Sequence, residues 1–226
     1  RLDAEILVGG DDGPGEVAVL RLRGQLAEHA NSVAVPLLLS DTPVVAFWPH
    51  DAPDVPADDP IGRHAQRRIT DLSTAEDVKT ALRTRQSGYR PGDTDLSWTR
   101  LTPWRSALAA ALDQPTPTIT AGMVTAEELS PSAVLLAGWL EQRLGVPIGL
   151  ETNSGAGING VRLTTAEGDI AISRPDGTQA ILSRPGVPDA RVGLARRDLA
   201  ELLAEDLRRL DPDEVFGTTI TRMTLP

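Results

Sequence analysis

Residues 44–48 read VVAFW, and this short run decides the fold class of the first half of the chain. A continuous apolar run of this length is typical of a strand that is buried on both faces of a parallel sheet. A second short strand is expected at residues 67–71, and a helix with an apolar stripe at Ala75, Val78 and Leu82 follows it. The alternation of strand and helix predicts an α/β N-terminal domain with a Rossmann-like, partly parallel sheet.

Upstream of this run the sequence predicts a hairpin. Residues 6–8 and 17–22 have the pattern of strands, and the segment GGDDGPGE between them is rich in turn-forming residues. A helical stretch is expected from about Gln25. The chain starts at Arg1, close to the first strand, so we expect that an N-terminal segment preceding it is missing.

The second half predicts a different class of domain. The segment QPTPT at residues 114–118 is the best candidate for a linker, which divides the chain into domains of residues 1–115 and 116–226. After it come a strand at residues 119–124 and an apolar helix that starts at Ser130 and Pro131.

Strand-like segments joined by short turns then predict an antiparallel meander. These segments are residues 148–150, 161–165, 169–173 and 179–183. Residues 196–210 predict an amphipathic helix whose leucines face inward. The second domain is therefore expected to be α+β, with an antiparallel meander and flanking helices.

The composition limits the classes of function. The 226 residues carry a formal net charge of −10, whereas binding to nucleic acid or to an anionic membrane surface requires a basic surface. No cysteine is present, which excludes disulfides, thiol nucleophiles and zinc–cysteine sites. No apolar run approaches the roughly eighteen residues of a membrane-spanning helix, and no signal peptide is visible. We therefore expect a cytoplasmic protein with no nucleic-acid or membrane partner.

The segment GAGING at residues 155–160 matches the G-x-G-x-x-G pattern of dinucleotide-binding loops. Such a loop must be followed by a helix, whose N-terminus holds the pyrophosphate. Here the segment VRLTTAEGDIAI follows, and it alternates like a strand. A glycine turn is therefore the favoured interpretation, and no cofactor is predicted.

Carboxylates and histidines give no strong indication of a catalytic or metal site. Neither G-x-S-x-G nor H-E-x-x-H occurs in the sequence. The pairs Asp58/Asp59 and Asp93/Asp95 could hold a metal, but both precede short helical segments, where aspartate commonly caps backbone N–H groups. Capping is the favoured interpretation, and no metal site is predicted.

Three arginines, Arg63, Arg67 and Arg68, are expected to cluster on a short helix. In an acidic protein such a cluster is the most plausible anion-binding site, for example for a sugar-phosphate effector. The alternative, which we favour, is that these arginines pair with aspartates of the preceding loop at residues 50–60.

Residues 92–105 read GDTDLSWTRLTPWR and contain two of the four tryptophans. Pro103 disfavours helix at the residue before it, so the chain is expected to bend ahead of Trp104. Trp104 leads the apolar face of the following helix and is expected in the core, whereas the direction of Trp98 is not fixed. Stacking of Arg100 or Arg105 on a tryptophan would fit both a packed corner and a docking surface, because Trp and Arg dominate binding hot spots.

Three segments, PLLLSDTPVVAFWP at 36–49, DPIGRHAQRRITDLS at 59–73 and GDTDLSWTRLTPWRSALAAALDQ at 92–114, resemble the glucose-6-phosphate dehydrogenase assembly protein family, OpcA. They occur in the order and spacing of the family, and the third is the most specific. Members of the family usually carry an additional N-terminal portion.

The resemblance implies a non-enzymatic protein that binds glucose-6-phosphate dehydrogenase and assembles or activates it. It supplies no catalytic residues. The expected partner-binding residues are Asp93, Asp95, Trp98, Arg100, Trp104 and Arg105. The alternative from the α/β pattern alone is a sugar-phosphate- or nucleotide-binding enzyme or sensor module.

Overall fold

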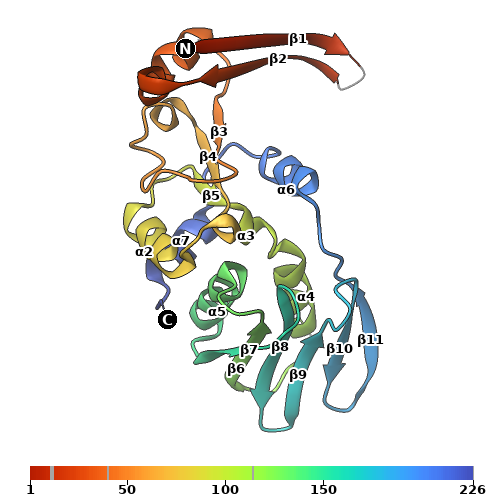
Figure 1. Cartoon of the computed structure of the whole chain (residues 1–226). Helices are drawn as coiled ribbons and strands as arrows, with labels where there is room; N and C mark the ends of the chain where they lie inside the picture. The colour runs from red at the N-terminus through yellow and green to blue at the C-terminus, as the bar shows by residue number, and fades with distance from the viewer. Residues whose placement is uncertain (11–12, 40, 114, 226) are drawn as a thin grey trace.

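The computed structural model describes residues 1–10, 13–39, 41–113 and 115–225 of the chain. An antiparallel hairpin of β1 (Leu2–Gly10) and β2 (Gly13–Leu22) projects from one end of the molecule (Figure 1). We call these two strands the N-terminal arm. A 3₁₀ turn (Gly24–His29), α1 (Ala30–Ala34) and a second 3₁₀ turn (Val35–Leu37) follow the arm and contain no buried residue. The predicted hairpin and helical stretch are confirmed, although residues 11 and 12 of the turn lie outside the described residues.

A small parallel sheet forms the centre of the first half, as the run VVAFW predicts. It contains β3 (Val45–Phe47), β4 (Arg67–Thr70) and β5 (Asp93–Asp95), with β4 in the middle. The helix α2 (Val78–Gly88) connects β4 to β5 and starts after Asp77, whose carboxylate accepts a hydrogen bond from the Thr80 N–H. All residues of β4 and β5 are buried, which fits the covered sheet of an α/β domain.

After β5 the chain turns through two helices. These are α3 (Leu96–Thr99) and α4 (Thr102–Leu112), which carries Pro103 in its first turn. The predicted bend ahead of Trp104 lies between these two helices, but the expectation that Thr102 is not helical is wrong, because α4 starts there. The helix α4 directs Trp104 and Leu108 into the core.

The second half contains a six-stranded sheet in the order β11-β10-β9-β8-β6-β7. Its strands are β6 (Ile119–Ala126), β7 (Ile148–Thr152), β8 (Ile158–Thr165), β9 (Gly168–Ser173), β10 (Gln179–Arg184) and β11 (Val187–Gly193). The strands from β8 to β11 form an antiparallel meander. The α+β prediction is confirmed, with two corrections: β7 runs parallel to β6 at the sheet edge, and the sequence analysis missed β11.

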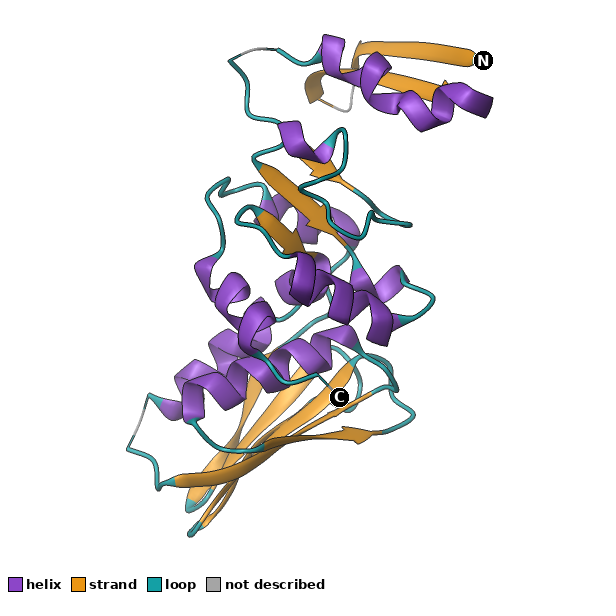
Figure 2. Cartoon of the chain, turned by 90° about the vertical axis from the view of Figure 1, so that its left-hand side faces the viewer, coloured by secondary structure: helices purple, strands orange, loops and turns teal. Residues whose placement is uncertain are grey.

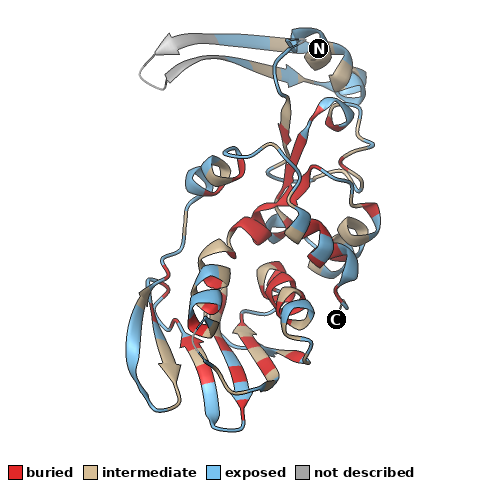
Figure 3. Cartoon of the chain, turned by 180° about the vertical axis from the view of Figure 1, so that it is seen from behind, coloured by how far each residue is buried: buried red, intermediate tan, exposed pale blue. Residues whose placement is uncertain are grey.

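One face of this sheet is covered by α5 (Pro131–Leu144), as Figure 2 shows. Buried and exposed residues alternate along β8, which is the pattern of a strand with one face on the core. The main hydrophobic cluster joins this sheet and α5 to Trp98, Trp104 and residues of α2, so the core extends across both halves (Figure 3).

The last part of the chain returns to the first half. The helix α6 (Leu199–Asp206) lies beside α3, and α7 (Glu214–Arg222) packs between α2 and α5. The Gln86 side-chain amide donates to the carbonyls of Ile220 and Met223 and holds this end in place. The structure corrects the predicted helix at residues 196–210, because the helix is shorter and Leu199 and Leu207 are exposed. The helix α7 was not predicted.

Residue 114 of the predicted linker lies outside the described residues, and β6 starts shortly after it. Among the described residues no helix is long and apolar enough to cross a membrane.

Candidate functional site

Asp95 is the last residue of β5 and the N-cap of α3. Its carboxylate accepts hydrogen bonds from the Ser97 N–H at 2.8 Å, the Thr70 hydroxyl at 2.6 Å and the Leu72 N–H at 3.0 Å. The predicted capping role is therefore confirmed for this residue. The side chain is only 1% exposed, and burial raises the pKa of Asp95 to about 6.

The titration of Asp95 predicts a dependence of stability on pH. Because the pKa is raised above 3.8 in the folded state, the protonated form stabilises the fold. This contribution is fully present below about pH 4 and is lost as the pH rises through about 6. Relative to Asp95→Asn, the free energy of unfolding of the wild-type protein should fall by about 2 kcal/mol between about pH 4 and pH 6. Urea denaturation of both proteins across this range measures the difference, and a constant difference would contradict the prediction.

The three arginines of the predicted anion site do not come together on one helix. Arg63 is exposed in a 3₁₀ turn (Gly62–His64), whereas Arg67 and Arg68 are consecutive buried residues of β4. Consecutive strand residues point to opposite faces of the sheet, so their guanidinium groups diverge. This corrects the predicted position of the cluster, and no anion site at these residues is retained.

The two buried arginines pair with carboxylates outside the preceding loop. Arg68 forms an ion pair with Asp93 and donates to the carbonyls of Ala65 and Pro91. Arg67 donates to the carboxylate of Asp206 at 2.6 Å, and each of the two side chains is only 5% exposed. The predicted pairing with aspartates of the loop at residues 50–60 is therefore wrong. The first pair joins β4 to β5 within the parallel sheet, and the second connects β4 to the end of α6.

Trp98 packs in the core and is 1% exposed. Its indole N–H donates to Asp213 at 2.8 Å, and its ring lies 5.7 Å from the ring of Phe216. The guanidinium of Arg105 stacks over the indole at 4.0 Å, which confirms the expected stacking of arginine on tryptophan. The structure thus corrects the expectation that the Trp98 side chain faces a partner, because this side chain does not reach the surface.

Trp104 is buried as expected, whereas Arg100 is partly exposed. Both terminal nitrogens of Arg100 donate to the carboxylate of Asp71 at 2.8 Å, which is a bidentate ion pair. The guanidinium of Arg174, the residue that follows β9, lies 5.1 Å from the Trp104 ring. Of the expected partner-binding residues, Asp93, Asp95, Trp98 and Trp104 are buried, and only Arg100 and Arg105 are partly exposed.

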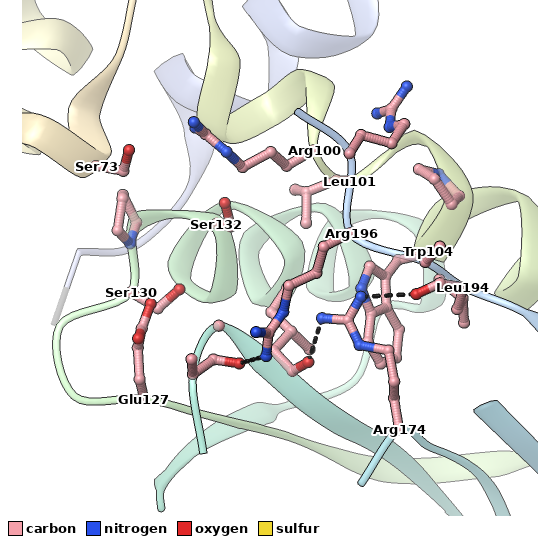
Figure 4. A pocket seen from close by; sticks show the side chains of 17 residues that line it. Ser73, Arg100, Leu101, Trp104, Glu127, Ser130, Ser132, Arg174, Leu194 and Arg196 are labelled. Carbon is pink, nitrogen blue, oxygen red and sulfur yellow. Dashed lines mark hydrogen bonds between the residues drawn. The ribbon is translucent and has the colours of Figure 1, made fainter. Parts of the chain in front are cut away.

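A cavity with a volume of about 320 Å³ lies beside this corner. Figure 4 shows Arg100 and Leu101 at the top of the view, Trp104, Leu194 and Arg174 at its right, and Arg196 near its centre. The start of α5 and residues 156–158 of the glycine-containing segment complete the wall. No local sequence pattern predicts this site, because six separate segments between residues 73 and 197 form it.

The segment GAGING begins in the turn between β7 and β8 and continues into β8 from Ile158, so the prediction that a strand and no helix follows is confirmed. Gly157 has a φ of 63°, which is the left-handed conformation that glycine adopts readily. Within the described residues there is no group of three or more histidine, aspartate or glutamate side chains that could hold a metal.

Comparison with known proteins places the chain in a family. A family model described as the glucose-6-phosphate dehydrogenase subunit N-terminal domain matches residues 1–87, and a model of the C-terminal domain matches residues 91–220. The two matches therefore divide the chain upstream of the predicted boundary at residue 115. A search of curated proteins found no match.

Solved structures with a similar fold are oxidoreductases of low sequence identity. KijD10, a 3-ketoreductase from Actinomadura kijaniata, is 12% identical over 84% of this chain and 78% of that chain, with a TM-score of 0.51. The UDP-N-acetylglucosamine 3-dehydrogenase GnnA from Acidithiobacillus ferrooxidans is 13% identical over 87% of this chain and 84% of that chain, with a TM-score of 0.45. At 12% identity the first match shows a shared fold alone.

The two OpcA models follow one another along the chain, in agreement with the segments at residues 36–49, 59–73 and 92–114. Since the match to the C-terminal model alone covers more than half of the residues, the protein belongs to the OpcA family of glucose-6-phosphate dehydrogenase subunits.

Proposed function

We propose that the protein is a non-enzymatic, cytoplasmic assembly factor that binds glucose-6-phosphate dehydrogenase and favours its active oligomer. The descriptions of both family models support this partner. The structural observation that carries the proposal is the apolar face of the N-terminal arm.

The two faces of the arm differ in character. Because residues alternate between faces along a strand, the register that pairs Leu2 with Leu22 and Ile6 with Ala18 places one set of apolar side chains together. This apolar face consists of Leu2, Ala4, Ile6, Ala18, Leu20 and Leu22. The opposite face is mixed: it carries charged residues, including the ion pair of Arg21 with Glu5 at 3.4 Å, and also the apolar residues Val17 and Val19.

Burial is described for residues 1–6 and 17–22 of the arm, and within them the apolar face is open to solvent at its outer end. Ile6 is 67% exposed, and Ala4 and Ala18 beside it are also exposed. An isolated two-stranded hairpin is marginally stable in water, and contiguous exposed apolar surface typically marks a binding site. Leu37 and Leu39, after α1, add further exposed apolar side chains. A partner that covers this face would bury it and stabilise the hairpin.

The expected effect on the dehydrogenase follows from linkage. An assembly factor shifts the equilibrium between two oligomers only by the difference between its affinities for them. The arm has a higher affinity for one oligomer when only that oligomer presents the whole surface to which the arm binds.

This function is tested by mixing the purified chain with glucose-6-phosphate dehydrogenase from the same organism. Analytical ultracentrifugation should show a complex and a larger fraction of one dehydrogenase oligomer, and the dehydrogenase rate should change with the same dose dependence. The chain alone should show no dehydrogenase activity. If the masses and the rates in the mixture equal those of the separate proteins, the proposal is wrong.

A further inference from the structure

The cavity beside Trp104 contains two arginines whose charges are not neutralised by a carboxylate. Four arginines line it, but Arg100 pairs with Asp71 and Arg197 pairs with Glu205. Arg174 and Arg196 form no ion pair within the described parts of the chain. Their guanidinium groups donate instead to the backbone carbonyls of Leu194, Ile158 and Ala156.

Arg174 is in an unusual environment for a charged group. Its residue is 6% exposed, and its Nε atom is buried without a hydrogen-bond partner. Burial lowers the pKa of Arg174, and the nearby charge of Arg196 lowers it further, against a smaller opposite effect of Asp176. Two cations are thus held together at the cost of desolvation and mutual repulsion, and a bound anion would offset both.

The surrounding backbone maintains this arrangement. A Cβ atom at Gly177 would lie 3.1 Å from the guanidinium carbon of Arg196, so the glycine leaves space for this side chain. Ser130, Pro131 and Ser132, at the start of α5, also line the cavity. The N-terminus of this helix of 14 residues, capped by Ser130, adds a partial positive charge to the cavity.

The remaining wall differs from the arginine side. Glu127 is the one acidic residue among the described residues that line the cavity, and Figure 4 shows it near Ser130, at the side of the view opposite Arg174. A carboxylate accepts hydrogen bonds from hydroxyl groups but repels a phosphate. Leu101, Leu194 and Pro131 supply apolar surface between the two ends. The cavity therefore favours an anionic group at one end of a ligand and hydroxyl groups at the other.

We propose that this cavity binds a small phosphorylated polyol or sugar, with its phosphate held by Arg174 and Arg196 and its hydroxyl groups near Glu127. Its volume of about 320 Å³ falls within the range of small-molecule sites. The site is separate from the three arginines that the sequence suggested, and it does not depend on the proposed binding of the dehydrogenase.

Isothermal titration calorimetry of the full chain alone tests this site. Glucose 6-phosphate serves as a representative hexose phosphate, with inorganic phosphate and glucose as the two partial ligands. Glucose 6-phosphate should bind more tightly than either partial ligand, because only it occupies both ends of the cavity. No binding of glucose 6-phosphate, or equal binding of inorganic phosphate, would overturn the proposal.

Two matched variants locate the binding. Arg196 is exposed, so Arg196→Gln should fold and should weaken the binding of glucose 6-phosphate by roughly tenfold or more, as expected for a lost charge-assisted hydrogen bond. Arg191→Gln removes an exposed arginine of β11 outside the cavity and should leave the affinity unchanged. Equal effects of the two variants would show that the anion binds through general charge, and would overturn the assignment.

Discussion

Replacing Trp98 with alanine is expected to lower the free energy of unfolding by about 3–5 kcal/mol, the range for truncation of a buried aromatic side chain. The ring is fully enclosed between Phe216 and Arg105, and the core around it joins both halves of the chain. The substitution also leaves Asp213 without its indole donor, although this carboxylate still caps α7 through the Phe216 N–H. Urea denaturation followed by circular dichroism measures the loss.

Trp98→Phe is the control for this prediction. It keeps most of the apolar volume but removes the hydrogen bond to Asp213, so it should cost less than the alanine variant. The folded fraction of both variants should bind the dehydrogenase like the wild-type protein, since the side chain does not reach the surface. A fully stable Trp98→Ala protein that no longer binds the dehydrogenase would contradict the buried position.

Replacing Arg67 with methionine should cost a similar amount, about 3–5 kcal/mol, because it leaves a buried carboxylate without its cation. Asp206 would keep only hydroxyl donors, those of Thr99 and Thr94. The pair connects β4 to the end of α6, so its loss should release the last part of the chain from the parallel sheet. Thermal and urea denaturation measure the effect.

The double variant Arg67→Met/Asp206→Leu separates the loss of the pair from the cost of the isolated charge. Replacing both members of a buried ion pair with apolar residues is often close to neutral, so the double variant should be clearly more stable than Arg67→Met. Salt should have little effect on the wild-type pair, because buried charges are weakly screened. A double variant that is less stable than the single one would contradict this account.

The sequence predicted the fold well where one local pattern was decisive. The run VVAFW indicated the parallel sheet, and alternation with short turns indicated the meander. It failed where tertiary packing overrode the local preference. The segment EVFGTTITR is rich in β-branched residues yet forms α7, since Phe216 and Ile220 pack into the main cluster on one helical face. The strand β11 carries Pro188 and lies at a sheet edge, which weakened its pattern.

The candidate sites were harder to predict than the fold. The three arginines Arg63, Arg67 and Arg68 were expected on one short helix, but the chain forms a single 3₁₀ turn there and then becomes extended in β4. The direction of Trp98 depends on Phe216 and Asp213, more than a hundred residues later in the chain. The cavity likewise requires Arg174 and Arg196, which follow β9 and β11, to meet Trp104 of α4, which no local pattern encodes.

The apolar face of the N-terminal arm is the proposed binding surface for glucose-6-phosphate dehydrogenase. Two variants of the arm, on opposite faces, provide a matched pair: Ile6→Asp and Glu5→Gln. Both positions are exposed, so neither change should alter the stability of the main core. Circular dichroism and thermal denaturation confirm that both variants are folded.

The most direct measurement is the affinity of the wild-type chain and of these two variants for the purified dehydrogenase, determined by titration calorimetry at one salt concentration. Ile6→Asp should weaken binding about thirtyfold or more, the effect of losing an apolar hot-spot residue of about 2 kcal/mol. Glu5→Gln should bind like the wild-type chain. Equal affinity of the Ile6→Asp variant and the wild-type chain would contradict the account.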